Sequence, residues 1–338
     1  MLRSKEETAP PTVSESRAAL RQAKSIREGW HSGLRGAIGY IVRDRGERGG
    51  SGVALKVMTV TGTTGMEASE LPIITRSRLV HDLRKLGVLP GQVIMLHASV
   101  KAIGWIVGGP DTVLQALLDI LVPEGTLMMY VGWEDSPYEM AQWPEDRQRA
   151  YLEECPPFDP ARSRAYRKWG ILTEYLRTWP GARRSDHPDA SFAAVGSRAR
   201  WITESHPLQY GYGPGSPLAK LCEAGGQVLL LGAPLNSITL LHYAEHLAKV
   251  PGKHVVRYKM PILRDGQRVL VEIEEFDTNQ GIGGRDAGQY FETIAHKYLS
   301  SGKGRSGKVG AAQSYLFDAA DLTEFAVQWM ESTFGRGE

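Results

Sequence analysis

The stretch VIMLHASVKAIG, residues 93–104, decides the fold, because an apolar run of strand length ends in a polar, glycine-containing loop. Residues 93–96 have the length and composition of a buried strand. Two similar runs occur at residues 126–131 and 228–231, each with a helical pattern nearby. This alternation predicts an α/β fold in which a central sheet is flanked by helices.

Capping residues predict where several helices begin and end. Gly87 is expected to end the first helix as its C-terminal cap. Pro110 begins a helix that is predicted to run to Leu121. Ser237 is expected to cap another helix, which continues through Val250.

The Asp-Gly pair at residues 265–266 is the strongest hairpin signal in the chain, because it lies between two strand-like segments, residues 255–263 and 268–273. A hairpin is antiparallel, so the sheet is predicted to be mixed. Asp321 followed by Glu324 three residues later predicts a capping box at the start of a final amphipathic helix.

The composition is that of an ordinary globular protein of 338 residues, with 42% hydrophobic and 23% charged positions. One large domain or two closely packed halves would fit this length. The net charge of +2 is uneven: residues 1–66 contain eleven Lys and Arg against six acids, which leaves −3 for the rest. An acidic main domain argues against nucleic-acid binding and favours a cationic ligand.

Residues 1–69 mix serine, glycine, proline and charge without sustained periodicity. We expect them to be a flexible extension or an artefact of an upstream start, without a role in the chemistry. Two cysteines, Cys155 and Cys222, are too few for a disulfide scaffold or a thiolate metal cluster, which suits a reducing cytoplasm. No apolar run approaches the roughly 20 residues of a membrane helix, so we expect a cytoplasmic protein without a membrane partner.

His242, Glu245 and His246 form an HxxEH string on a predicted helix, where residues three and four apart share a face. This is the pattern of inverted-motif zinc peptidases, in which the two histidines bind the metal. A catalytic zinc also needs a third protein ligand, and nothing singles one out. Structural histidines on a helix are the other interpretation.

The segment RRSDHPDAS, residues 183–191, places Arg, Ser, Asp and His within nine positions. A Ser-His-Asp hydrolase is rejected, because the chain has no GxSxG elbow and triad members come from separate segments. The arginine forks and hydroxyls favour an anion pocket for a phosphate-bearing ligand. A solvated Arg pair beside a structural loop is the alternative.

Acidic residues gather in two segments, 134–159 and 272–277. They are Glu134, Asp135, Glu139 and Asp159, and Glu272, Glu274, Glu275 and Asp277. Most such clusters are solvated faces, but acids that line a cleft would attract cations. Residues 97–104 follow a predicted strand, where backbone amides can face a ligand, and no Walker loop or GxGxxG points to a nucleotide.

These segments occur in the order found in the antibiotic acetyltransferase family, the aminoglycoside 3-N-acetyltransferases that do not share the GNAT fold, and the chain resembles that family over residues 72–334. The matching stretches are LGV at 86–88, HASVKAIG at 97–104, WEDSPYE at 133–139, PPFDP at 156–160, PGARRSDHPDAS at 180–191, GAPLNS at 232–237, HYAE at 242–245, FDTN at 276–279 and YLFD at 315–318. Asp186 departs from the pattern, which more often has a small residue there.

The resemblance implies a mixed central sheet flanked by helices, an acetyltransferase domain at residues 70–338 and acetyl-CoA as co-substrate without a metal. It places the general base on His242, with Glu245 or Asp189 as the orienting acid, and leaves His187 open as a second catalytic histidine, a coenzyme contact or a structural residue. The implied coenzyme contacts are His97, Ala98, Ser99, Val100, Lys101, Gly104, Ser185 and Ser191. For the aminoglycoside we expect Glu134, Asp135, Tyr138, Asp159, Asp277 and Asn279, because several ammonium groups need several acceptors.

The partners expected from the resemblance are an aminoglycoside antibiotic and acetyl-CoA, with no nucleic acid and no membrane, in a monomer or homodimer. Three other functions stay open from the residues alone. They are a zinc hydrolase built on the HxxEH string, a sugar-binding protein without catalysis, and an acyltransferase of the same fold that acts on a different amine.

Overall fold

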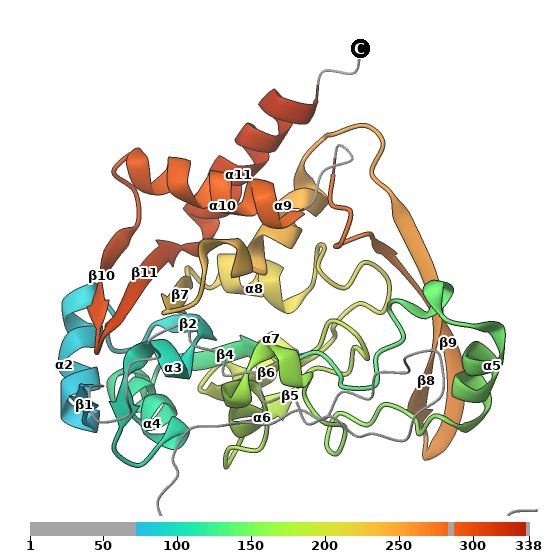
Figure 1. Cartoon of the computed structure of the whole chain (residues 1–338), viewed down its shortest axis with the longest axis horizontal. Helices are drawn as coiled ribbons and strands as arrows, with labels where there is room; N and C mark the ends of the chain where they lie inside the picture. The colour runs from blue at the N-terminus through green and yellow to red at the C-terminus, as the bar shows by residue number, and fades with distance from the viewer. Residues whose placement is uncertain (1–71, 283–286, 336–338) are drawn as a thin grey trace, which may run out of the picture. The chain divides into compact units, whose positions relative to one another are not determined.

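The structure, a computed structural model, describes residues 72–282 and 287–335, so the extension expected at residues 1–69 lies outside the described residues. A seven-stranded sheet with the order β10-β11-β7-β2-β4-β6-β5 forms the centre of the fold (Figure 1). Its strands are β2 (Val93–Ala98), β4 (Thr126–Tyr130), β5 (Arg183–Arg184), β6 (Phe192–Gly196), β7 (Gln227–Leu231), β10 (Arg305–Val309) and β11 (Ala312–Asp318).

The sheet is mixed, which confirms the predicted fold class. β2 runs parallel to both β4 and β7, whereas β6 and β11 join the sheet in the antiparallel sense. The three apolar runs identified in the sequence are β2, β4 and β7, the adjacent strands at the centre of the sheet. Strands that are covered on both faces have nearly continuous apolar sequences, and this explains why these three were recognisable.

Helices cover both faces of the sheet. They are α2 (Arg76–Leu86), α3 (Val100–Ile103), α4 (Pro110–Leu121), α5 (Glu145–Glu154), α6 (Ile171–Arg177), α7 (Ala199–Thr203), α8 (Pro217–Glu223), α9 (Leu240–Leu247), α10 (Ala287–Ser300) and α11 (Ala319–Phe334), with short 3₁₀ turns η2 (Met140–Gln142), η3 (Arg167–Trp169) and η4 (Leu235–Ser237). Alternate strand residues point to opposite faces. Met95 and Leu230 therefore pack in the core with α7–α11, whereas Ile94 and Leu229 pack in the core with α2, α4 and α6.

The predicted boundaries are confirmed for two helices and are wrong for two others. Gly87 caps α2 in the left-handed region, with φ 115°, and α4 spans the predicted residues. Ser237 is not a helix cap: its hydroxyl donates to the Pro234 carbonyl in η4, and α9 begins later and ends earlier than predicted. Asp318, not Asp321, caps α11, because its carboxylate accepts from the backbone N–H of Asp321.

The predicted hairpin is present as β8 (Val255–Arg264) and β9 (Gln267–Phe276), and Asp265 and Gly266 have the positive φ angles, 51° and 75°, that a type I′ turn requires. It forms a separate two-stranded sheet and does not join the central one. The prediction of a mixed sheet was therefore right for a different reason. The hairpin packs on Trp133 and Phe158, which places it beside the 133–139 loop.

A second small sheet pairs β1 (Ile73–Ile74) with β3 (Trp105–Ile106). The described residues all belong to one compact unit, Met66–Glu338. Within residues 72–282 and 287–335, no helix is both long enough and apolar enough to cross a bilayer.

Candidate functional site

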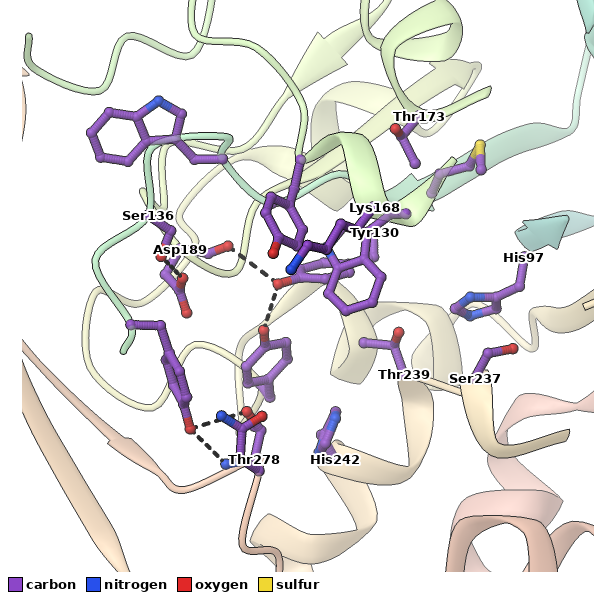
Figure 2. A pocket seen from close by; sticks show the side chains of 18 of the residues that line it. His97, Tyr130, Ser136, Lys168, Thr173, Asp189, Ser237, Thr239, His242 and Thr278 are labelled. Carbon is purple, nitrogen blue, oxygen red and sulfur yellow. Dashed lines mark hydrogen bonds between the residues drawn. The ribbon is translucent and has the colours of Figure 1, made fainter. Parts of the chain in front are cut away.

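A cavity of about 940 Å³ lies where the parallel strands end. His97 contributes to its wall from the end of β2, and Tyr130 contributes from the end of β4. Further walls come from the 132–139 loop, from the segment that joins η4 to α9, and from residues 278–279 ahead of α10 (Figure 2). Ligands of open α/β sheets bind at this edge, and the volume suits a ligand of cofactor size.

His242 lines the cavity from the first turn of α9. Its Nδ1 lies 2.6 Å from Oε2 of Glu245, which is buried one helical turn further on. Because a carboxylate can only accept, Nδ1 carries a proton, and in a neutral imidazole Nε2 then carries the lone pair. Within the described part of the chain, Nε2 has no hydrogen-bond partner, so this pair presents a proton acceptor to a ligand in the cavity.

Two aromatic rings fix the plane of the His242 imidazole. Tyr212 packs against it at a centroid distance of 5.3 Å, and Phe291 of α10 meets it edge to face at 4.9 Å. Both rings also line the cavity. An imidazole that is held by a carboxylate and by two rings keeps one orientation toward the cavity.

The HxxEH string predicted that His246 converges with His242 and Glu245, but the structure shows that it does not. Its Nε2 lies 2.9 Å from Oε1 of Glu275, and its ring packs on Phe276 at 4.6 Å. The two histidines therefore use different carboxylates. No group of three His, Cys, Asp or Glu residues suited to a metal ion occurs in the described ranges, and the two separate pairs argue against the zinc hydrolase.

His187 is buried in the core and is not part of the cavity wall. Its Nδ1 accepts from the backbone N–H groups of Asp189 and Ala190, at 3.2 and 2.8 Å, and its Nε2 donates to the Leu208 carbonyl at 3.1 Å. Burial lowers its pKa well below the ordinary value, so the ring is neutral. With both nitrogens engaged, these contacts favour the structural role among the three that the sequence left open.

Ser185 and Ser191 are also fully buried, away from the cavity wall. The Ser185 hydroxyl accepts from the Phe192 N–H and donates to Nδ1 of His206, at 2.9 and 3.0 Å. Ser191 accepts from Arg184 at 3.0 Å and donates to a backbone carbonyl. Both hydroxyls were expected to contact the coenzyme. Because both side chains face the core, their hydrogen bonds are made with protein groups instead.

The Arg184 guanidinium, which the sequence suggested for an anion pocket, is bonded to protein groups. It donates to the Ser163 and Gly132 carbonyls and lies 4.7 Å from the centre of the Phe158 ring. Burial lowers its pKa to about 9. The guanidinium joins the 132–138 loop to the central sheet, which is a structural task.

Asp189 lines the cavity, but His242 Nδ1 is bonded to Glu245 instead. The Asp189 carboxylate accepts from the Ser136 hydroxyl at 2.5 Å and from the Tyr258 hydroxyl at 3.0 Å. Burial raises its pKa. Of the two candidates for the orienting acid, Glu245 is the one that contacts His242, whereas Asp189 lies on the cavity wall.

The predicted coenzyme loop divides in two. His97, Ala98 and Ser99 line the cavity, whereas Val100, Lys101 and Gly104 belong to α3 and its end and do not. His97 Nε2 is buried and has no hydrogen-bond partner among the described residues. Burial lowers the His97 pKa to about 4, so the imidazole is neutral at physiological pH. A buried polar nitrogen without a partner is costly, and a bound ligand would supply one.

The acidic candidates divide in the same way. Glu134, Tyr138 and Asn279 line the cavity, whereas Asp135, Asp159 and Asp277 do not. Asp277 accepts from the Tyr138 hydroxyl at 3.1 Å, and the same hydroxyl accepts from the Thr278 N–H at 2.8 Å. Asp277 therefore orients Tyr138 from behind the wall.

Several residues of the site were not among the sequence-based candidates. They are Tyr130, Ser136, Lys168, Tyr212, Thr239 and Phe291 on the wall, and Tyr258 and Tyr290 behind it. Ser136 lies within the WEDSPYE stretch, and Tyr130 lies within the strand predicted at residues 126–131, so both had a signal. Tyr258 and Tyr290 had none, because their side chains reach the site from a hairpin and a helix that are distant in sequence.

A scan against family models matches residues 95–331 to the model described as aminoglycoside 3-N-acetyltransferase. Among curated proteins, the chain is 54% identical over 261 residues to aminoglycoside N(3)-acetyltransferase III of Pseudomonas aeruginosa, covering 77% of this chain and 95% of that protein. It is 48% identical over 267 residues to aminoglycoside N(3)-acetyltransferase VIII of Streptomyces fradiae, covering 78% and 93%.

Solved structures agree with the sequence matches. AAC-IIIb in a binary complex with CoASH is 47% identical, with a TM-score of 0.74, over 79% of this chain and 100% of that chain. AAC-VIa with bound sisomicin is 39% identical, with a TM-score of 0.71, over 78% and 100%. Family model, close relatives and fold thus all identify the same family, and the chain belongs to the aminoglycoside 3-N-acetyltransferases.

Proposed function

We propose that this chain transfers the acetyl group of acetyl-CoA to the 3-amine of a 2-deoxystreptamine aminoglycoside, with His242 as general base, and thereby confers resistance to the antibiotic. The observation that carries the proposal is the His242–Glu245 pair on the wall of a cavity of about 940 Å³ at the carboxyl ends of the strands. Relatives that are named for this reaction, and solved relatives with CoASH or sisomicin bound, support both substrates.

The base is needed because an aminoglycoside amine is mostly protonated near neutral pH and has no lone pair for attack. Nε2 of His242 accepts one proton from the ammonium group, and Glu245 stabilises the imidazolium. The freed amine attacks the thioester carbonyl carbon and the carbon–sulfur bond breaks. The nitrogen loses a second proton, the departing thiolate takes up one to become CoASH, and the other passes to solvent.

Direct transfer in a ternary complex fits the chain better than an acetyl-cysteine intermediate. Cys155 and Cys222 are both absent from the cavity wall. Burial raises the pKa of each thiol, which disfavours the thiolate that a nucleophile needs. The rate enhancement then comes from the base and from holding amine and thioester in line.

On the coenzyme side, the unpartnered His97 Nε2 fits the carbonyl groups of an acyl-CoA. A neutral imidazole can donate from this nitrogen without carrying a charge. We expect His97→Ala to raise the KM for acetyl-CoA about fivefold, the size of one ordinary hydrogen bond. Steady-state kinetics with each substrate varied in turn measure this effect. An unchanged KM for acetyl-CoA, or an equal rise for the aminoglycoside, contradicts the assignment.

On the aminoglycoside side, Asp189 offers a carboxylate to an ammonium group, next to Tyr138 and Asn279 on the same wall. We expect Asp189→Asn to raise the KM for the aminoglycoside at least about tenfold, because a hydrogen bond to a charged group contributes about 1.5 to 3 kcal/mol. The matched control is Asp159→Asn, which changes a carboxylate off the cavity wall that accepts from the Ala161 N–H. Equal KM values for the two variants would remove Asp189 from the site.

The function itself is tested by thiol release from acetyl-CoA with gentamicin, tobramycin, neomycin and apramycin, with and without a metal chelator. Rapid release that the chelator does not affect supports the proposal and ranks the substrates. Coenzyme binding without release on any aminoglycoside points to an acyltransferase for another amine. Release that the chelator abolishes overturns the metal-free mechanism.

A further inference from the structure

We infer that Tyr290 is a positioning residue of the acetyl transfer, whose hydroxyl holds Glu245 in the orientation that presents His242 Nε2 to the substrate amine. The inference rests on the proposed function of the His242–Glu245 pair. Tyr290 is buried in α10, 45 positions from Glu245, and is not part of the cavity wall. It therefore touches no substrate and acts only through the carboxylate.

Both oxygens of Glu245 are engaged. Oε2 accepts from Nδ1 of His242 at 2.6 Å, and Oε1 accepts from the hydroxyl of Tyr290. Only 3% of the Glu245 surface is exposed, so water does not supply the second donor. A buried carboxylate with a single donor can turn about its last bond, whereas two donors on different oxygens fix its plane.

The direction of the Tyr290 hydroxyl proton is also fixed. The backbone N–H of Ile282 donates to this oxygen at 3.1 Å, and the hydroxyl proton points to Glu245 because a carboxylate can only accept. Burial lowers the pKa of Lys253, although the nearby Glu245 carboxylate opposes this shift, and the ammonium group donates to the His246 carbonyl and not to Glu245. Among the described residues, Tyr290 is thus the side chain other than His242 that bonds this carboxylate directly.

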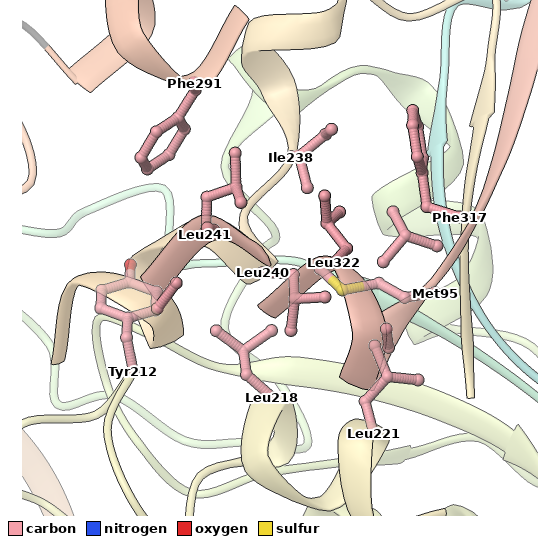
Figure 3. Packing of buried hydrophobic residues seen from close by; sticks show 14 of the residues in the cluster. Met95, Tyr212, Leu218, Leu221, Ile238, Leu240, Leu241, Phe291, Phe317 and Leu322 are labelled. Carbon is pink, nitrogen blue, oxygen red and sulfur yellow. The ribbon is translucent and has the colours of Figure 1, made fainter. Parts of the chain in front are cut away.

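Helix α10 braces both members of the pair through consecutive residues. Tyr290 bonds Glu245, and Phe291 packs edge to face on His242. The helix itself is anchored by Ile294 and Tyr298, which are buried with α9 and α11 in one core. Figure 3 shows Phe291 in the same cluster of buried side chains as Leu241 of α9. Tyr290 and Phe291 are therefore held in place by the buried core and not by the cavity loops.

The Tyr290 ring has its own packing, which makes a clean variant possible. It meets Phe291 at 5.2 Å and Phe334 at 5.5 Å, in edge-to-face geometry. Phenylalanine retains these contacts and removes only the hydroxyl. The matched control is Tyr298→Phe: Tyr298 is buried in the same helix and donates to a carboxylate, Asp321, that has no part in the site.

The first experiment measures kcat and both KM values for Tyr290→Phe, Glu245→Gln and the double variant, beside Tyr298→Phe. We expect Tyr290→Phe to lower kcat about tenfold with both KM values unchanged, since it removes one hydrogen bond to a charged group. In the Glu245→Gln background the same change should have little further effect, because the two residues act as one unit. An additive loss, an equal loss in Tyr298→Phe or an unchanged kcat overturns the inference.

A second measurement does not depend on turnover. In protein labelled with nitrogen-15 at histidine, the Nδ1 proton of His242, identified by its loss in His242→Gln, should give a downfield signal that moves upfield in Tyr290→Phe and stays in place in Tyr298→Phe. A signal that is unchanged in Tyr290→Phe contradicts the inference, even if the wild type fails to acetylate any aminoglycoside. That failure would instead overturn the proposed function.

Discussion

Replacing His242 with alanine lowers kcat by about 10²- to 10⁴-fold, the usual contribution of general-base catalysis, which corresponds to roughly 3 to 5 kcal/mol of transition-state stabilisation. We expect this loss because, in the proposed mechanism, Nε2 of His242 accepts the proton of the substrate amine in the cavity. The coenzyme does not need this acceptor to bind, so the KM for acetyl-CoA should change little. Steady-state thiol release measures both quantities.

His246 provides the matched control, because it lies on the same helix, is buried and pairs with a carboxylate. It is not on the cavity wall. His246→Gln keeps a side-chain donor for Glu275 and should retain most of kcat, whereas His242→Gln should behave like the alanine variant. If His242→Gln and His246→Gln lose activity equally, the loss reflects the stability of α9 and not a base.

Lowering the pH from about 7 to about 5.5 destabilises the fold through three buried histidines. Burial lowers the pKa of His97 and His206 to about 4 and that of His187 well below its ordinary value. The unfolded chain has histidine pKa values of about 6.5, so it binds more protons than the folded chain in this range. The stability is therefore complete above about pH 6.5 and is lost as the pH falls toward about 4.

The expected loss is about 1 kcal/mol per histidine over this interval, and roughly 3 to 4 kcal/mol in all. Urea unfolding at the two pH values measures it. His206→Gln should reduce the loss by about one third, because glutamine binds no proton in either the folded or the unfolded state. The exposed His296 serves as control, and His296→Gln should leave the pH dependence unchanged. Equal unfolding free energies at the two pH values would contradict the neutral state of these rings.

The central strands and the hairpin could be predicted from the sequence because their signals are local. β2, β4 and β7 are covered on both faces and have short apolar runs, and the Asp-Gly pair supplies the left-handed turn by itself. The start of α9 could not be predicted from Ser237, because the preceding Pro234 leads into a 3₁₀ turn whose carbonyl takes the serine hydroxyl. The Ser237 hydroxyl bonds this carbonyl and does not cap the helix.

The contact between His242 and Glu245 was predictable because the two residues are one helical turn apart, so the sequence spacing alone brings them together. Whether a single hydroxyl or carboxylate lies on the cavity wall could not be predicted from the sequence. Ser185 and Ser191, next to the strands β5 and β6, face the core. Asp277 orients Tyr138 from behind the wall, whereas Asp189 reaches the cavity. Which side of a wall a side chain occupies depends on partners from distant segments, as the contact between Tyr290 and Glu245 illustrates.

The structure of the reaction product tests the central claim most directly. The protein is incubated with acetyl-CoA and gentamicin, and two-dimensional NMR of the purified product locates the new acetyl group. The account predicts one acetyl group on the 3-amine of the 2-deoxystreptamine ring, formed in equal amount to the CoASH released. An acetyl group on another amine, or CoASH without any acetylated antibiotic, would contradict it.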